Sequence, residues 1–270
     1  MIISPHNDAL IRAYFDAVHV AFPIIDPKNF RRSSAAPSLL ASIYALAQPY
    51  CADARHTDPK PLLDFTSQAL PIEARSAKLE TVEAALLHAQ RHTYTFRAPT
   101  MPGLWAEVGS LVGISHDIGL NIDASDWDIT IPEKRRRKRL WWAVYMQDKW
   151  AALTLGRPPY LNDEQHDVTM VQVSDFETAD SPLSDKESVA ARTFIAHARL
   201  AKILSGILSR LYSVKGVKQM RSIAVQEVCD VVSHFTQQLE AWKQETAHPL
   251  IESELTFDPT GKATGDCQIP

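Results

Sequence analysis

A run of six consecutive positive charges is the most distinctive chemical feature of the sequence. It consists of Lys134, Arg135, Arg136, Arg137, Lys138 and Arg139, and Leu140-Trp-Trp142 follows at once. The whole chain of 270 residues holds 28 Lys and Arg against 32 Asp and Glu, a formal net charge of −4. The run therefore stands out in an acidic protein that does not favour nucleic-acid binding over its whole surface. Clustered cations can contact phosphates or serve as a nuclear import signal.

The expected position of the run on a helix favours a structural role. Thr130-Ile-Pro-Glu133 predicts a capped helix start, and this helix should continue to about Leu155. Six successive residues encircle a helix axis, so the cations cannot form one flat basic face. The helix dipole also disfavours cations near a helix start. We therefore expect carboxylates, with Glu133, Asp126 and Asp128 nearby in sequence, to pair with part of the run. Import, partner binding and phosphate contact remain alternatives.

The aromatic residues after the run are expected to lie in the core. Trp141, Trp142 and Tyr145 could instead form an aromatic cage or a base-stacking platform. Adjacent indoles point to different sides of a helix, however, and both find partners only inside a multi-helix core. Asp148 follows on the same helix, and we expect it to pair with Arg157 just beyond the helix end.

His116-Asp117 suggests the metal site of a phosphohydrolase, but the signal is weak. His88, His92, Asp148 and Asp167 are further candidate ligands. Neighbouring helical residues point about 100° apart, and the sequence lacks HExxH, GxSxG and the glycine-rich phosphate loops. A helical metal-dependent hydrolase is therefore the alternative, while the expectation is no enzyme, no catalytic residue and no cofactor in this chain.

The cysteines also give no sign of a metal centre or a thiol enzyme. Cys51, Cys229 and Cys267 are odd in number and far apart in sequence. Such spacing predicts neither a disulfide scaffold nor a zinc cluster, and it is typical of a reducing intracellular compartment. The sequence shows no secretory signal at its start and no apolar run long enough to span a membrane.

Apolar residues recur at helical intervals along most of the chain. Leu10, Tyr14, Val18 and Phe22 follow each other at intervals of four. The expected helices cover about 10–22, 38–47, 62–70, 76–94, 104–118, 131–155, 185–212 and 217–244, with a break at Lys215-Gly216. Strands and internal repeats are not predicted. The expected fold is all-α, an irregular multi-helix bundle of about seven to nine helices.

Two local details belong to this prediction. Gly109 and Gly113 lie one turn apart and could let another helix approach closely. Ser184-Asp-Lys-Glu187 forms a second capping box, which predicts the start of a helix after a long acidic loop.

Several segments, in this order, resemble the fungal-specific transcription factor domain. This domain is the middle homology region of fungal regulators that bind DNA through a six-cysteine binuclear zinc cluster. The segments are Leu10-Ile-Arg-Ala-Tyr-Phe-Asp-Ala-Val-His19, Phe22-Pro-Ile-Ile25, Ala85-Leu-Leu-His-Ala-Gln-Arg91, residues 105–109, Asp117-Ile-Gly-Leu120, Arg137-Lys-Arg-Leu-Trp-Trp142, Asp148 and Gly156-Arg-Pro158. The resemblance extends from about Leu10 to Val168 and more loosely to Trp242. Its most specific parts are the Arg-x-Arg-Leu-Trp-Trp and Gly-Arg-Pro motifs.

The resemblance implies a regulatory domain over 1–244, followed by a C-terminal tail over 245–270 that is truncated or poorly ordered. It implies a nuclear regulator of RNA polymerase II transcription that contacts other regulators or the transcription machinery. A small-molecule effector and a homodimer are left open. A structural subunit of a DNA complex with the same fold is a further alternative. The residues implied as a structural scaffold are Arg139, Trp141, Trp142, Asp148, Gly156, Arg157 and Pro158.

This chain departs from the family pattern because it contains no closely spaced cysteines. Zinc binding and sequence-specific DNA binding are thus expected only from a cluster upstream of this sequence, in a full-length relative. We expect the chain to be either a fragment or a natural form without the DNA reader.

Overall fold

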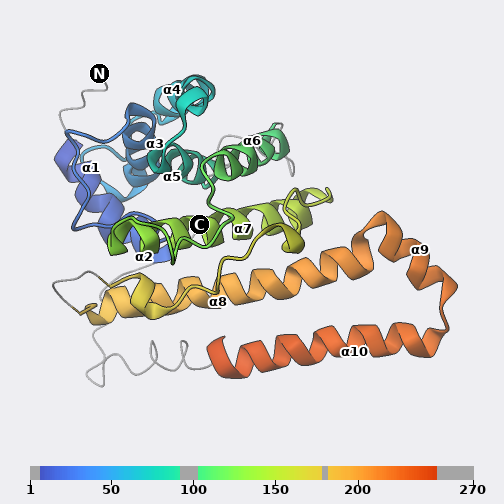
Figure 1. Cartoon of the computed structure of the whole chain (residues 1–270). Coiled ribbons are helices and arrows are strands. Elements are labelled where there is room, and N and C mark those ends of the chain that lie inside the picture. The colour runs from blue at the N-terminus through green and yellow to red at the C-terminus, as the bar shows by residue number, and fades with distance from the viewer. Residues whose placement is uncertain (1–6, 92–102, 178–181, 248–270) are drawn as a thin grey trace. The chain divides into compact units, whose positions relative to one another are not determined.

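Helices and irregular connections make up the part of the chain that the structure describes, and no β-strand occurs there. The computed structural model describes residues 7–91, 103–177 and 182–247. The chain divides into two units, Met1–Ile223 and Ala224–Pro270. The helices of the first unit are α1 (Asn7–Ala13), α2 (His19–Ala21), α3 (Pro37–Ala47), α4 (Lys60–Glu73), α5 (Leu79–Ala89), α6 (Leu104–Asp117), α7 (Ile131–Leu155), α8 (Asp185–Ile207) and α9 (Val214–Ser222) (Figure 1). The second unit contains α10 (Val225–Trp242).

The all-α prediction is confirmed. A π-helical turn over Tyr14–Val18 joins α1 to α2 in one continuous helix, so the described residues form nine separate helices. None of these helices is both long and apolar enough to cross a membrane. The tail expected over 245–270 lies outside the described residues from position 248 onward.

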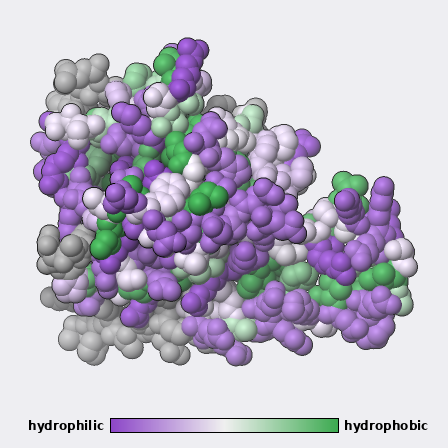
Figure 2. Space-filling view, viewed as in Figure 1, coloured by the Kyte–Doolittle hydropathy of each residue, from purple (hydrophilic) through white to green (hydrophobic). Residues whose placement is uncertain are grey.

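Helix α7 is the central element of the first unit. It contacts α5 and α6 on one side and α8 on another, as Figure 1 shows. Because neighbours surround it, α7 is buried around its whole circumference from Arg139 to Met146. This explains why its sequence has no one-sided apolar stripe. Over the part of the first unit visible in Figure 2, hydrophilic residues predominate and hydrophobic ones are scattered.

Both ends of α7 follow from local sequence. At the start, Thr130 Oγ1 accepts a hydrogen bond from the Glu133 N–H at 3.4 Å, with Pro132 in the first turn. At the end, Gly156 takes a left-handed conformation with φ +62°, which glycine adopts without strain. The second predicted capping box is also present, since Ser184 and Glu187 cap each other at the start of α8.

The first helix differs from its predicted apolar stripe. Leu10 and Tyr14 are buried as expected, but the next fully buried position is His19, not Val18. The π-helical turn adds one residue at this point and shifts the inward-facing position by one. The interval of four in the sequence could not reveal this shift.

The predicted break at Lys215-Gly216 is wrong, and so is the single helix over 217–244. The chain leaves helical geometry earlier, at Ser213, whose Oγ accepts the Gly216 N–H at 2.9 Å and thereby caps α9. Gly216 lies inside α9, packed close to the backbone oxygen of Arg210. A second break at Ile223 separates α9 from α10.

Gly109 and Gly113 do not mark a helix contact. A Cβ added at Gly109 would lie 2.7 Å from Cζ of Tyr160, and one at Gly113 would meet nothing within 4 Å. Tyr160 stacks on Trp105 with a centroid distance of 4.6 Å. Gly109 therefore makes room for an aromatic side chain from the connection after α7.

The substitution Trp142→Ala tests the core role of α7. The Trp142 side chain is 2% exposed, so its removal should lower the free energy of unfolding by about 3–5 kcal/mol in urea denaturation. Trp150→Ala on the same helix is the matched control. Trp150 is 38% exposed, so its loss removes less buried apolar area and should cost less than the loss of Trp142. Equal effects of the two substitutions would contradict the core assignment.

Candidate functional site

Every cation of the basic run has a partner within the protein. Arg136 donates to both carboxylate oxygens of Glu83 at 2.7 Å. Lys138 pairs with Asp175 at 3.4 Å, and Arg137 with Glu133 at 3.3 Å. The remaining acceptors are backbone carbonyls: Lys134 donates to Ser125, Arg135 to Glu177, Arg137 to Ile118 and Arg139 to Asp175. The run thus connects the start of α7 to three other segments of the first unit.

The carboxylates that pair with the run come mainly from distant segments. Of the three expected partners, Glu133 pairs as described, whereas no ion pair joins Asp126 or Asp128 to the run among the described residues. Glu83 on α5 is 1% exposed. Burial raises the pKa of Glu83, and the hydrogen bonds from Arg136 oppose that shift.

The aromatic residues after the run lie in the core, as expected. Trp141 and Trp142 are buried, and Trp142 Nε1 donates to the Thr169 carbonyl at 2.9 Å. Tyr145 donates to Asp163 Oδ1 at 2.8 Å. These hydrogen bonds hold the connection after α7 against the helix. The polar groups of Trp142 and Tyr145 therefore bind partners within the protein.

The predicted pair between Asp148 and Arg157 does not form. Asp148 accepts the backbone N–H groups of Tyr160 at 2.8 Å and Leu161 at 3.1 Å, and it lies 3.2 Å from Lys149 Nζ. Arg157 is exposed. The left-handed turn at Gly156 returns the chain along α7, which brings later backbone groups to the carboxylate. The Pro158 carbonyl accepts a hydrogen bond from Trp105 Nε1 at 3.4 Å.

The hydrolase alternative receives no support from the arrangement of its candidate residues. His116 and Asp117 do not lie in the core, and His116 lies beside Trp141 with a centroid distance of 6.0 Å. His88 interacts with Ser67 Oγ at 3.1 Å, while His92 lies outside the described residues. Within residues 7–91, 103–177 and 182–247, no three His, Cys, Asp or Glu side chains converge as metal ligands would.

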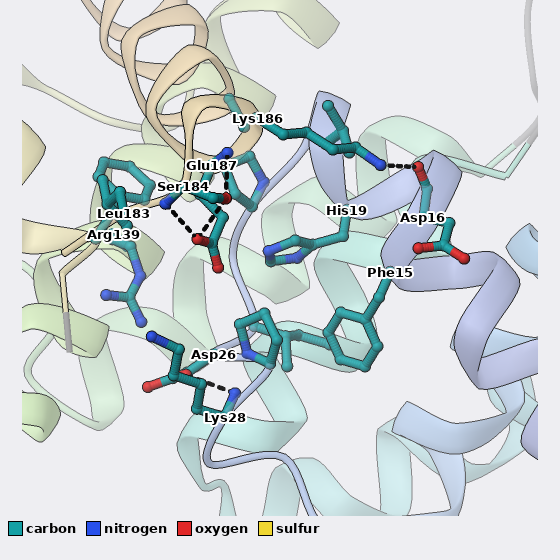
Figure 3. A pocket seen from close by; sticks show the side chains of 16 residues that line it. Phe15, Asp16, His19, Asp26, Lys28, Arg139, Leu183, Ser184, Lys186 and Glu187 are labelled. Atoms are coloured by element: carbon teal, nitrogen blue, oxygen red, sulfur yellow. Dashed lines mark hydrogen bonds between the residues drawn. The ribbon is translucent and has the colours of Figure 1, made fainter. Parts of the chain in front are cut away.

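A cavity of about 270 Å³ lies between the first helix, the connection that follows it, α7 and the start of α8. We call it the α2–α8 pocket. Its apolar wall includes Phe15, Pro23 and Phe176. Its polar lining comprises Asp16, His19, Asp26, Lys28, Arg139, Ser184, Lys186 and Glu187. In Figure 3 the imidazole of His19 points into the space between Glu187 and the connection that carries Asp26.

Most charged groups around the α2–α8 pocket have local partners. Glu187 accepts hydrogen bonds from the Ser184 N–H at 2.8 Å and Oγ at 2.7 Å, which lower its pKa. Lys186 Nζ donates to the Asp16 carbonyl at 2.9 Å. Asp26 accepts the Lys28 N–H at 3.0 Å. These contacts fix the rim of the pocket.

Arg139 and His19 have fewer polar contacts than the other groups of the lining. Arg139 is 5% exposed, yet it forms no ion pair with a carboxylate among the described residues. Its contacts are the Asp175 carbonyl and the Phe176 ring, 5.7 Å from the guanidinium carbon. His19 is 9% exposed, and its Nδ1 has no hydrogen-bond partner. Burial and then the charge of Arg139 lower the pKa of His19 to about 4.

Sequence reasoning found Arg139 but missed the rest of the pocket. His19 precedes Arg139 by 120 positions, and Glu187 belongs to a capping box that already accounts for its presence. No spacing rule joins side chains from a π-helical turn, a proline-rich connection and two later helices. The only available signal was the excess of cations at the start of α7.

Comparison with known proteins gives a consistent set of relatives. The sequence profile described as "Fungal specific transcription factor domain" matches residues 11–244. An uncharacterized transcriptional regulatory protein of Schizosaccharomyces pombe is 28% identical over 84% of this chain and 35% of its own length. Transcriptional activator protein DAL81 of Saccharomyces cerevisiae is 32% identical over 59% of this chain and 17% of its own length.

Cutinase transcription factor 1 alpha of Fusarium vanettenii is 26% identical over 80% of this chain and 25% of its own length. The chain thus spans between 17% and 35% of the length of these three relatives. No solved structure gives a significant match.

Duplex DNA should bind this chain only weakly and without sequence preference. The cations of the run already contact protein acceptors, so few remain to release counterions from phosphates. Fluorescence anisotropy with a labelled duplex at about 0.15 M salt should give a dissociation constant no tighter than about 10⁻⁶ M. Lys134→Gln should leave the titration unchanged. Tighter binding that this substitution abolishes would contradict the internal role of the run.

Stability should fall on mild acidification because two histidines are buried in neutral form. Burial is the main cause that lowers the pKa of His19 and of His88, each to about 4. The unfolded chain, with histidine pKa values near 6.5, binds more protons between pH 6.5 and 4. The contribution of these two histidines to the free energy of unfolding is therefore fully present above pH 6.5, and it decreases as the pH falls toward 4. At pH 5 each histidine should account for a loss of about 2 kcal/mol relative to pH 7.

The variant His88→Gln isolates one of these contributions. Urea unfolding at a series of pH values should show a smaller difference between pH 7 and pH 5 for the variant than for the original chain. His234→Gln is the matched control, because His234 is exposed on α10. An identical pH dependence in all three proteins would show that His88 is not buried in neutral form.

Proposed function

Because the chain belongs to the fungal-specific transcription factor domain family, we propose that it is the regulatory part of a nuclear, sequence-specific transcriptional regulator. The match over residues 11–244 carries this proposal. The names of the relatives describe transcriptional regulators, an activator and transcription factors. Within the proposal, the domain acts by contact with other regulators or the transcription machinery, and it carries out no chemical reaction.

The contacts of the basic run support a regulatory role in preference to direct DNA reading. All six cations are bound to acceptors of the first unit, including the buried Glu83. A DNA-binding surface needs several converging cations that are free to meet phosphates. We therefore assign DNA reading and zinc binding to a cysteine-rich module outside these 270 residues.

The α2–α8 pocket supports control by a bound molecule. Its lining combines apolar side chains with eight polar or charged ones, and such polar groups can orient a bound molecule. The pocket joins α2, α7 and α8, so an occupant would contact three helices at once. Such an occupant could stabilise one packing arrangement of these helices over another. It would thereby change the conformation of the domain that partner proteins bind.

A reporter assay tests the regulatory role. The chain is placed between a heterologous DNA-binding module and an activation segment, and reporter output is measured in yeast at equal protein amounts. The folded domain and the Trp142→Ala variant should give outputs that differ by about fivefold or more, the lower end of usual regulatory coupling. Trp150→Ala should behave as the original chain. Equal outputs from the folded domain and from Trp142→Ala would contradict the proposal.

A further inference from the structure

Arg139 differs from the arginine one turn earlier on the same helix. Arg136 has its guanidinium matched by both oxygens of Glu83 at 2.7 Å. Arg139 is more deeply buried and has only a backbone carbonyl and an aromatic face. A buried guanidinium with five N–H donors is costly unless an anion compensates it. Arg139 thus lacks the direct carboxylate contact that Arg136 has.

The position of Arg139 indicates from where a carboxylate could reach it. Arg139 lines the α2–α8 pocket together with His19. Figure 3 shows its guanidinium directed toward the connection that carries Asp26 and Lys28. The nearby carboxylates of Asp26, Glu83 and Asp175 act on Arg139 through space without forming an ion pair. An anion inside the pocket could meet the guanidinium directly.

We propose that the α2–α8 pocket binds a small organic acid, with its carboxylate held by Arg139 and His19 and its apolar part packed against Phe15, Pro23 and Phe176. The planar fork of an arginine matches the two oxygens of a carboxylate. The unpartnered Nδ1 of His19 supplies a further hydrogen-bonding group in the same space. Both polar groups are at least nine-tenths buried.

The charges around the pocket favour a single negative charge on the ligand. The lining contains the cations Lys28, Arg139 and Lys186 and the carboxylates Asp16, Asp26 and Glu187. These formal charges balance. A dianion such as inorganic phosphate would meet three carboxylates with no surplus of cations, whereas a monoanion needs one compensating guanidinium.

The volume of the pocket limits the ligand to the size of a metabolite. A cavity of 270 Å³ equals about nine water molecules in the liquid, at about 30 Å³ each. It lies just below the usual range of small-molecule sites, about 300–1,000 Å³. This size favours a compact acid with one ring over a nucleotide or a peptide segment.

The effect of binding would be to join three elements that are distant in sequence. The acid would link the first helix through His19, α7 through Arg139 and the segment before α8 through Phe176. This inference rests on the proposed function for the regulatory consequence of binding. The binding itself does not depend on that function.

The probe for the test is 3-phenylpropanoate, and its neutral amide, 3-phenylpropanamide, is the matched control. The two compounds have the same size and ring, and only the acid carries the charge. Saturation-transfer NMR on the full chain at pH 7 should show saturable binding of the acid with a dissociation constant in the low millimolar range or tighter, as expected for about eleven non-hydrogen atoms. The amide should bind at least about tenfold more weakly, because it loses a charge-assisted hydrogen bond.

Two substitutions identify the site, and a third is their control. Arg139→Gln should weaken binding of the acid at least about tenfold. Arg137→Gln makes the same charge change on the same helix, but Arg137 does not line the pocket, so binding should change less than about twofold. Val20→Phe fills the pocket from its partly exposed wall and should abolish binding. Circular dichroism verifies folding, and Val20→Phe decides the result if Arg139→Gln does not fold.

Any of four results would overturn the proposal. The first two are no saturable binding of the acid up to about 20 mM, well above the expected dissociation constant, and equal binding of acid and amide. The other two are undiminished binding in folded Arg139→Gln and undiminished binding in folded Val20→Phe. The reporter assay remains independent of this titration. A pocket that binds the acid in a domain without reporter effect would refute the regulatory role alone, and a regulatory domain that ignores the acid would refute the ligand site alone.

Discussion

The need to find acceptors for six consecutive cations determines much of the first unit. A buried cation without an acceptor is far more costly than an exposed one, and the start of α7 lies against other elements. Glu83 from α5, the carbonyl of Ile118 after α6, and Asp175 before α8 provide these acceptors. The packing of three segments is thereby set by charge as well as by apolar contact. A basic run in sequence becomes a connector between elements in the fold.

The same helix changes character within one turn. From Glu133 to Lys138 its residues are partly exposed, and from Leu140 to Met146 they are buried on every side. Arg139 lies at the boundary: it is 5% exposed, and it forms no ion pair with a carboxylate among the described residues. The α2–α8 pocket lies at this point, with Arg139 in its lining.

Sequence patterns predicted several features that depend on neighbouring residues. The caps at Thr130 and Ser184, the end at Gly156 and the burial of Trp142 all follow from local chemistry. Some predictions failed where helix geometry changes locally, at the π-helical turn before His19 and at Gly216, and others where the outcome depends on the path of the chain after a turn. Asp148 accepts backbone hydrogen bonds and does not pair with Arg157, because left-handed Gly156 turns the chain back along α7. The pocket could not be predicted, since its walls come from segments that share no spacing.

The π-helical turn makes the inward position of His19 a matter of helix geometry as well as of sequence. Leu10 and Tyr14 are four residues apart, whereas His19 follows Tyr14 by five, and the wide turn absorbs the additional residue. A relative of equal length with a regular α-helix here would turn the residue equivalent to Val18 inward in place of the imidazole. Relatives that differ only in the winding of this one turn would consequently carry chemically different cavities on the same bundle.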